Sequence, residues 1–300
     1  TFPVSPGAFQ TTFGGGVNED GNGPYDMAII KFSANGSNRV YATYLGGIGN
    51  EQPHSMIVDA QGNLIVAGRT NSINYPTTTA GVGNGGGYDI VITKFNATGS
   101  ALLGSIKIGG SGNDCVNIRA KYVGQNRGAE ATRRNYGDDA RSEVIIDAAN
   151  NVYLASCTQS SGTEASGGFP IRNSPIQPVF GGGNSGPDHF PQDGVIIKLN
   201  PNLSSVLFST FFGGSGDDAC FVISQNPLTG NLYVGGGTNS PNLPGDKTGV
   251  LQPNFQGGET DGFVTEILND GSAIIKTTYQ GTPGHDLVYG VQFDKNGFPY

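Results

Sequence analysis

Asp89-Ile-Val-Ile-Thr-Lys94-Phe95 is the stretch that decides the fold, because close copies of it recur along the chain. The copies are Asp26-Met-Ala-Ile-Ile-Lys31-Phe32, Asp193-Gly-Val-Ile-Ile-Lys198-Leu199 and Asp261-Gly-Phe-Val-Thr-Glu266-Ile267. Successive aspartates lie 63, 104 and 68 residues apart, and the long middle interval contains extra sequence. Self-similarity of this kind indicates an array in which one supersecondary unit is repeated.

Three other blocks recur between these strands. One is a strand that ends in Gly-Gly, at Gly46-Gly47, Gly109-Gly110 and Gly213-Gly214, and a short acidic loop follows each copy. The next is a pair of apolar runs around a turn such as Gln61-Gly62-Asn63, which is typical of a β-hairpin. The last is a long loop with an aromatic-Pro or Leu-Pro step, which we place outside the sheets because Pro cannot donate to a ladder. One unit therefore holds four short strands.

We predict an all-β fold, a β-propeller of four-stranded antiparallel blades with about 60–70 residues per repeat. The composition agrees, because 50 of the 300 residues are Gly, which destabilises helices. The predicted blades are 1–45 (partial), 46–109, 110–213 with an insertion at 116–141, 214–281 and 282–300 (partial), in a single propeller or a segment of one. The two partial blades could pair and close a four-bladed ring, but we favour a segment of a longer polypeptide. A solenoid is the weaker alternative fold.

This pattern resembles the SBBP β-propeller repeat family, which is found in bacterial secreted and surface proteins. The resemblance covers nearly the whole chain except the insertion. The stretches that carry it are Pro6-Gly-Ala-Phe-Gln10, Thr43-Tyr-Leu-Gly-Gly47, Ile57-Val-Asp59, Gly62-Asn63, Ala67-Gly-Arg-Thr70, Asn74-Tyr-Pro76 and Asp89 to Lys94. The hairpin is also similar to the NHL propeller repeat, which implies that it supplies the two inner strands of each blade. The resemblance implies a fold and a secreted or cell-surface location, and it implies no particular activity.

Charge and composition argue against several classes of partner. The formal net charge is −8 and the 16 basic residues are dispersed, whereas binding to a phosphate backbone needs clustered Lys and Arg. No apolar run approaches the roughly 20 residues of a membrane-spanning helix. Cys115, Cys157 and Cys220 fit no zinc spacing. One disulfide with a spare thiol is an open alternative, and we favour three buried free thiols.

The acidic loops are the first candidate site, and they recur at the same blade junction. Their carboxylates and Asn carbonyls are hard oxygen ligands of the kind that Ca²⁺ requires. The alternative is that these side chains bond their own backbone in turns, and we favour it because no loop matches the EF-hand signature. The candidate metal ligands are Asn50, Glu51, Asn113, Asp114, Asp217 and Asp218.

The repeated Asp and Lys of the deciding stretch are expected to be structural. An active site rarely needs four copies of one carboxylate, and Glu266 breaks the lysine series. We expect the aspartates to accept hydrogen bonds in turns or to face a neighbouring blade. His54, His189 and His285 occupy non-equivalent positions, and no nucleophile elbow, phosphate loop or Cys-His pattern stands out.

The insertion at 116–141 is the one unique surface, and it is basic in an acidic protein. Unique loops on a repetitive scaffold often carry function, although a solvated loop is the alternative. The candidate partner-binding residues are Arg119, Lys121, Tyr122, Arg127, Arg133, Arg134 and Tyr136.

These observations favour a non-catalytic binding or structural module of a secreted or cell-surface bacterial protein, with adhesion or assembly as its role. Its partner would be a protein or glycan at the cell surface, with Ca²⁺ as a possible cofactor. One alternative is a propeller hydrolase or lyase that acts on polysaccharide through carboxylates at the channel mouth. Another is a rigid spacer without a ligand, as repeat arrays often are.

Overall fold

The structure is a computed structural model that describes residues 2–18, 24–115, 141–173, 175–183 and 190–300. The described residues form β-strands connected by turns and loops, and η1 (Glu164–Ser166) is the one short helix among them. No helix in this part of the chain is long and apolar enough to cross a membrane.

The strands form three four-stranded antiparallel sheets and one two-stranded sheet. The two-stranded sheet A contains β1 (Met27–Phe32) and β2 (Arg39–Leu45). Sheet B contains β3 (Glu51–Val58), β4 (Leu64–Thr70), β5 (Asp89–Phe95) and β6 (Leu102–Ile108). Sheet C contains β7 (Glu143–Ile146), β8 (Val152–Thr158), β9 (Asp193–Leu199) and β10 (Val206–Phe212). Sheet D contains β11 (Asp218–Gln225), β12 (Leu232–Thr238), β13 (Asp261–Ile267) and β14 (Ile274–Gln280).

The predicted order of strands within a unit is confirmed. Each four-stranded sheet runs hairpin, Asp-to-Lys strand, Gly-Gly strand, with neighbours in the chain paired antiparallel. The register repeats as well, since Thr70 pairs with Asp89 in sheet B, Thr158 with Asp193 in sheet C and Thr238 with Asp261 in sheet D. The all-β prediction is therefore correct, but the described strands do not close into a ring.

The hairpin turns explain why an aspartate recurs at the start of this turn. Asp59 Oδ1 accepts hydrogen bonds from the backbone N–H groups of Gln61 (3.0 Å) and Asn63 (2.9 Å), and Gly62 has a φ of +80°. Glycine adopts this left-handed conformation without a steric penalty, and the aspartate caps the turn. Asp147 and Asp294 cap the equivalent turns through the same backbone contacts.

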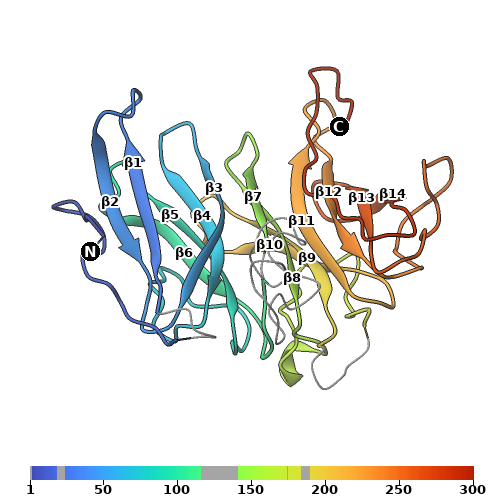
Figure 1. The fold of residues 1–300 in the computed structure, drawn as a ribbon, viewed down its shortest axis with the longest axis horizontal. Helices are drawn as coiled ribbons and strands as arrows, with labels where there is room; N and C mark the ends of the chain where they lie inside the picture. The colour runs from blue at the N-terminus through green and yellow to red at the C-terminus, as the bar shows by residue number, and fades with distance from the viewer. Residues whose placement is uncertain (1, 19–23, 116–140, 174, 184–189) are drawn as a thin grey trace.

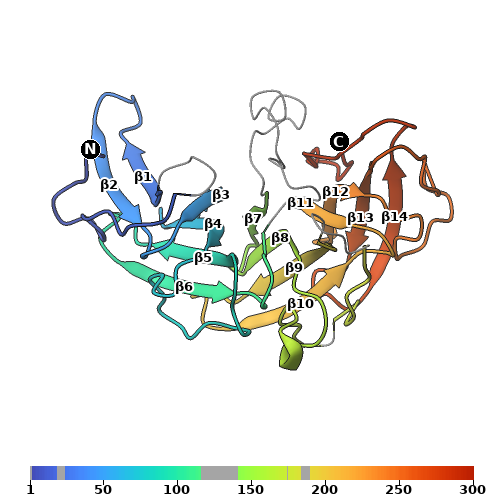
Figure 2. The same cartoon turned by 60° about the horizontal axis from the view of Figure 1, so that its bottom comes forward.

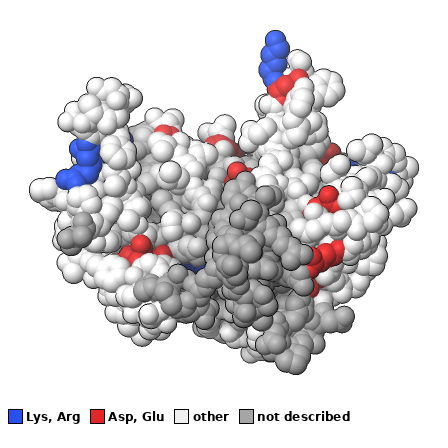
Figure 3. Space-filling view, in the orientation of Figure 1, with Lys and Arg blue, Asp and Glu red and all other residues white. Residues whose placement is uncertain are grey.

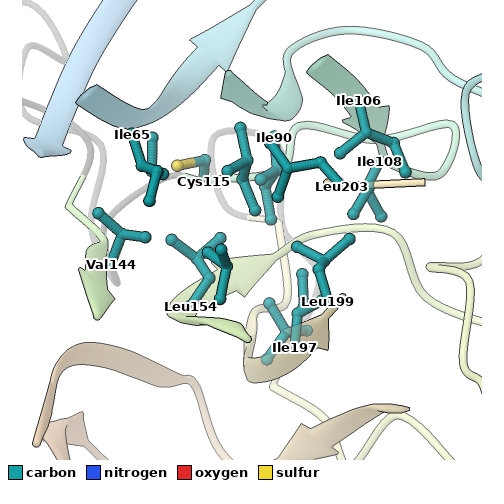
Figure 4. Close-up of a cluster of buried hydrophobic side chains, with 14 of the residues drawn as sticks. Ile65, Ile90, Ile106, Ile108, Cys115, Val144, Leu154, Ile197, Leu199 and Leu203 are labelled. Atoms are coloured by element: carbon teal, nitrogen blue, oxygen red, sulfur yellow. The ribbon is translucent and has the colours of Figure 1, made fainter. Parts of the chain in front are cut away.

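The core lies between successive sheets. Alternate residues of a strand point to opposite sheet faces, so β9 contributes Val195 and Ile197 to the cluster shared with sheet B and Ile196 to the cluster shared with sheet D. Figure 4 shows the first of these clusters, with Ile65 and Ile90 on one side and Leu154 and Ile197 on the other. Sheets B and C, which have a neighbouring sheet on each side, are thus buried on both faces along their third strands, β5 and β9.

The sheets fan out in chain order along an open arc (Figures 1 and 2). Sheet A lies at one end of the arc, and sheet D lies at the other together with the C-terminal residues. Three of the hydrophobic clusters each join two neighbouring sheets of the array, which is the organisation of a repeat protein.

Candidate functional site

The acidic loops lie where one sheet meets the next, and their carboxylates are buried. Asp114 Oδ1 accepts hydrogen bonds from the hydroxyls of Thr158 and Ser160 (2.9 Å for Ser160), while Oδ2 accepts from the backbone N–H of Gly110 at 2.8 Å. Asp114 itself is fully buried. Three donors therefore hold this carboxylate in place.

The same arrangement recurs at the other two junctions. Asp218 accepts from Thr238, from Ser240 (2.8 Å) and from the N–H of Gly214 (2.7 Å). Glu51 accepts from Thr70 (2.5 Å), Ser72 and the N–H of Gly47 (3.2 Å). The repetition shows that these carboxylates accept the same hydrogen bonds wherever two sheets meet.

A second carboxylate from the preceding sheet faces each of these acids. At the junction of sheets B and C, a Cβ atom added to Gly109 would lie 2.0 Å from Asp89 Oδ1 and 2.6 Å from Asp114 Oδ2. Only glycine fits between the two carboxyl groups, which explains the first glycine of the Gly-Gly pair after the fourth strand. The equivalent pairs are Asp26 with Glu51, Asp193 with Asp218, and Asp261 with Asp286.

Within the described residues, the Oδ1 atoms of Asp26, Asp89 and Asp261 are buried and accept no hydrogen bond. A buried acceptor without a donor is costly, and the cost falls when the adjacent carboxyl is protonated. Burial accordingly raises the pKa of Asp114 and that of Asp218 to about 8, and the neighbouring aspartate adds to the shift. Burial likewise raises the pKa of Asp193 to about 7 and that of Asp26 to about 6. The geometry and the pKa shifts both indicate carboxyl pairs that hold a proton near neutral pH.

The other predicted metal ligands bond the backbone. Asn113 Oδ1 accepts from the N–H of Tyr88 at 3.0 Å, and Asp217 Oδ1 accepts from that of Gln192 at 3.2 Å. Asn50 Oδ1 accepts from the N–H of Val17 at 3.2 Å. Among the described residues, no group of three or more His, Cys, Asp or Glu side chains is placed to hold a metal ion. The Ca²⁺ site stays a prediction, and the geometry assigns all six residues a part in the junctions.

The repeated lysines connect each sheet to the one after it. Lys31 Nζ donates to the carbonyl of Ala97 (3.1 Å), Lys94 Nζ to that of Pro201 (3.4 Å) and Lys198 Nζ to that of Asn269 (3.2 Å). The three acceptors occupy the same place in the turn between the third and fourth strands of the next sheet. Glu266 takes this position in sheet D, and it accepts from Asn231 Nδ2 at 2.7 Å instead.

Two sets of residues at the sheet junctions were not predicted from the sequence. The hydroxyl donors form a Thr-x-Ser pattern at the end of each second strand, visible as Thr70-Asn-Ser72, Thr158-Gln-Ser160 and Thr238-Asn-Ser240. A glutamine in three of the four long loops accepts from the glycine N–H that follows the fourth strand, with Gln10 bonded to Gly46, Gln177 to Gly213 and Gln252 to Gly281. Aligning the four units by their aspartates would have revealed both patterns.

The three cysteines are buried thiols that form no disulfide, as favoured from the sequence. Cys115 Sγ lies 2.9 Å from His54 Nδ1, a contact that the sequence did not suggest. Burial raises the pKa of Cys115 to about 11 and holds the pKa of His54 well below its usual value. A thiolate nucleophile needs a lowered thiol pKa, so this pair is neutral and suited to packing.

The predicted partner-binding residues, Arg119 to Tyr136, lie outside the described residues. On the face drawn in Figure 3, the described Lys and Arg side chains are few and widely separated.

No protein-family model matches the chain, and neither does any curated protein. The similarity to the SBBP repeat family therefore stays a prediction that rests on the residues quoted above.

Proposed function

We propose that the chain forms a β-propeller, or part of one, that acts as a non-catalytic structural and binding module of a secreted or cell-surface bacterial protein. The observation that carries this proposal is the repetition of the same buried polar contacts at successive sheet junctions. Asp114 and Asp218, with their Thr, Ser and Gly donors, are equivalent residues in equivalent roles. A catalytic site requires unlike residues that converge once, whereas stiffening an array requires like residues at every junction.

The order of strands supports the propeller interpretation. Inner hairpin, Asp-to-Lys strand and Gly-Gly strand follow one another in sheets B, C and D, and propeller blades are four-stranded antiparallel sheets of this kind. The secreted or surface location rests on the resemblance to the SBBP family. The partner is proposed to be a protein or a glycan, in keeping with the low positive charge.

Binding and turnover can be measured on the same preparation. Fluorescently labelled chain is applied to a glycan array and to intact bacterial cells, and release of reducing ends and of unsaturated uronate is followed with a panel of polysaccharides. We expect retention on the array or on cells, without turnover above a heat-denatured control. Turnover that Asp218→Asn abolishes while the far-UV circular dichroism spectrum is retained would support the hydrolase or lyase and overturn the proposal. If the chain shows no retention and no turnover, the result would favour the rigid spacer without a ligand.

A further inference from the structure

Lys107 departs from the repeat at the junction of sheets B and C. It pairs with Val91 in the register of sheet B, and the residues at the equivalent position of the other sheets are aromatic: Tyr44, Phe211 and Tyr279. Each of these rings packs on a Phe side chain of its own long loop, with ring centroids 5.6–6.2 Å apart. A lysine cannot make this ring contact, so its role in sheet B differs from that of its equivalents.

The Lys107 side chain is directed at Asp89. Its Nζ atom lies 3.0 Å from Asp89 Oδ2, and the Asp89 side chain is 2% exposed whereas that of Lys107 is 25% exposed. The two residues are diagonal neighbours on β6 and β5, and such neighbours can touch on one face of a sheet. A Cβ atom added to Gly85 would lie 3.3 Å from Asp89 Oδ2 and 3.7 Å from Lys107 Nζ. The backbone of the long loop thus lies close to both the amine and the carboxyl group.

The other oxygen of Asp89 faces the carboxyl group of Asp114. Within the described residues, Asp89 Oδ1 is buried and accepts no hydrogen bond. A Cβ atom added to Gly109 would touch both this oxygen and Asp114 Oδ2. Asp114 is fully buried, and burial raises its pKa to about 8, so its carboxyl group carries a proton at neutral pH. An acid O–H is therefore placed beside Oδ1, while an amine lies beside Oδ2.

We infer that Lys107 and Asp89 react to form an intramolecular amide bond between Lys107 Nζ and Asp89 Cγ, assisted by the carboxyl group of Asp114. Two reacting groups that a fold holds in contact behave as if each were present at a very high effective concentration. An acid placed to donate to the oxygen that becomes negative lowers the barrier further. The inference rests on the contacts of one junction and is independent of what the module binds.

The atoms balance among the three side chains. A proton passes from the Lys107 ammonium group to Asp89 Oδ2, which leaves a neutral amine beside a neutral carboxyl group. The nitrogen attacks Cγ, and the Asp114 O–H stabilises the negative charge that develops on Oδ1. A second proton moves from the nitrogen to Oδ2, the Cγ–Oδ2 bond breaks, and one water molecule leaves. Oδ1 remains as the amide carbonyl oxygen and accepts a hydrogen bond from Asp114. An ammonium group and a carboxylate thus become an amide and water.

A second Lys–Asp pair of sheet B differs at its carboxyl group and serves as an internal control. Lys94 Nζ lies 2.9 Å from Asp59 Oδ2, but Asp59 Oδ1 accepts from the backbone N–H groups of Gln61 and Asn63. Burial would raise the pKa of Asp59, yet hydrogen bonds from Asn63 and Lys94 lower it to about 2. Because a carboxylate that stays ionised is a poor electrophile for an amine, we expect no bond between Lys94 and Asp59.

The test is the intact mass of the purified, folded protein, measured by mass spectrometry after denaturation. The bond removes one water molecule, so the measured mass should fall below the mass calculated from the sequence by the mass of one water. In a tryptic digest we expect peptide 70–94 to be joined to peptide 95–119, without cleavage after Lys107. Cleavage after Lys94 should be normal, because its amine is unmodified.

Two kinds of variant separate the amine from the acid. Lys107→Arg keeps a cation beside Asp89 but has no primary amine, so it should have the full sequence mass. Lys107→Phe, which introduces the residue type of Phe211 in sheet C, is a second variant without the amine. Asp114→Asn removes the acid proton, and it should slow bond formation by about 100-fold or more in a time course that follows cell-free synthesis. Circular dichroism verifies that each variant folds.

The outcomes distinguish the amide bond from an ordinary ion pair. Full sequence mass in the wild-type protein after prolonged incubation would overturn the inference and leave the two residues as an ion pair. A mass deficit of one water that persists in both Lys107 variants would also overturn it, as would a linkage through Lys94. Bond formation at an unchanged rate in Asp114→Asn would overturn the part assigned to Asp114.

Discussion

At the residue scale, the carboxyl pairs make the stability of the fold depend on pH in an unusual direction. Most structural carboxylates stabilise a fold in their ionised form, because hydrogen bonds lower their pKa. Asp114 and Asp218 are also hydrogen-bonded, but burial beside a second carboxylate dominates and raises their pKa. Near neutral pH each pair therefore holds a proton that an unfolded chain would release.

The sign of the effect follows from the pKa values. Folded values of about 8 for Asp114 and about 7 for Asp193 lie above the ordinary value of 3.8, so their stabilising contribution is complete below about pH 4 and is lost as the pH rises through 7 to 8. We expect the free energy of unfolding, measured by urea titration, to fall by an amount on the order of a few kcal/mol between pH 5 and pH 8.5. Asp89→Asn, which places an amide donor opposite Asp114, should flatten this fall. Asp270→Asn is the control, because Asp270 is an exposed turn residue with a lowered pKa. If the free energy of unfolding of the wild-type protein rises between pH 5 and pH 8.5, the assignment of raised pKa values to the carboxyl pairs is contradicted.

At the scale of the element, the third strand of each sheet connects two neighbours through its lysine. Lys94 lies 2.9 Å from Asp59 Oδ2 at the hairpin turn of its own sheet, and it also donates to Pro201 in the next sheet. Burial alone would raise the pKa of Asp59, but hydrogen bonds from Asn63 and Lys94 lower it to about 2. The ion pair is thus a buried contact at the point where two sheets join.

Removing this lysine should destabilise the protein more than removing an exposed one. Lys94→Met leaves the buried Asp59 carboxylate without its cation, and we expect a loss of about 2–4 kcal/mol in the free energy of unfolding at pH 7. Lys276→Met is the matched control, because its pair with Asp246 is exposed and is expected to contribute less than about 1 kcal/mol. Urea denaturation of both variants measures the two losses in the free energy of unfolding. Equal losses would show that the buried ion pair of Lys94 stabilises the fold no more than the exposed ion pair of Lys276.

The elements were predictable from sequence because their signals are local. The Asp-to-Lys and Gly-Gly strands and the capped hairpin turns each rely on alternation, β-branched residues and turn chemistry within a few positions. The contacts at the junctions were harder to predict, because Asp114 meets Asp89 and Thr158 only after the sheets have brought three separate segments together. The acidic loops drew attention as possible metal ligands because carboxylates beside Asn and Gly occur both in Ca²⁺ sites and in turns. Their partners, which are hydroxyls and amide N–H groups, depend on the packing of adjacent sheets.

At the scale of the whole molecule, stability should vary along the array, because each sheet is held only by its neighbours. β9 lies in the middle of sheet C, is paired on both edges and contributes to the clusters on both faces. β1 lies at one end, is paired on one edge within the described residues and has an exposed outer face. Local opening therefore costs much less free energy at β1 than at β9.

Hydrogen exchange followed by mass spectrometry measures this gradient directly. In dilute solution we expect the amides of β1 to exchange about 100-fold faster or more than those of β9, with β5, the equivalent strand of sheet B, close to β9. Equal protection of β1 and β9 in dilute solution would contradict a nearest-neighbour array.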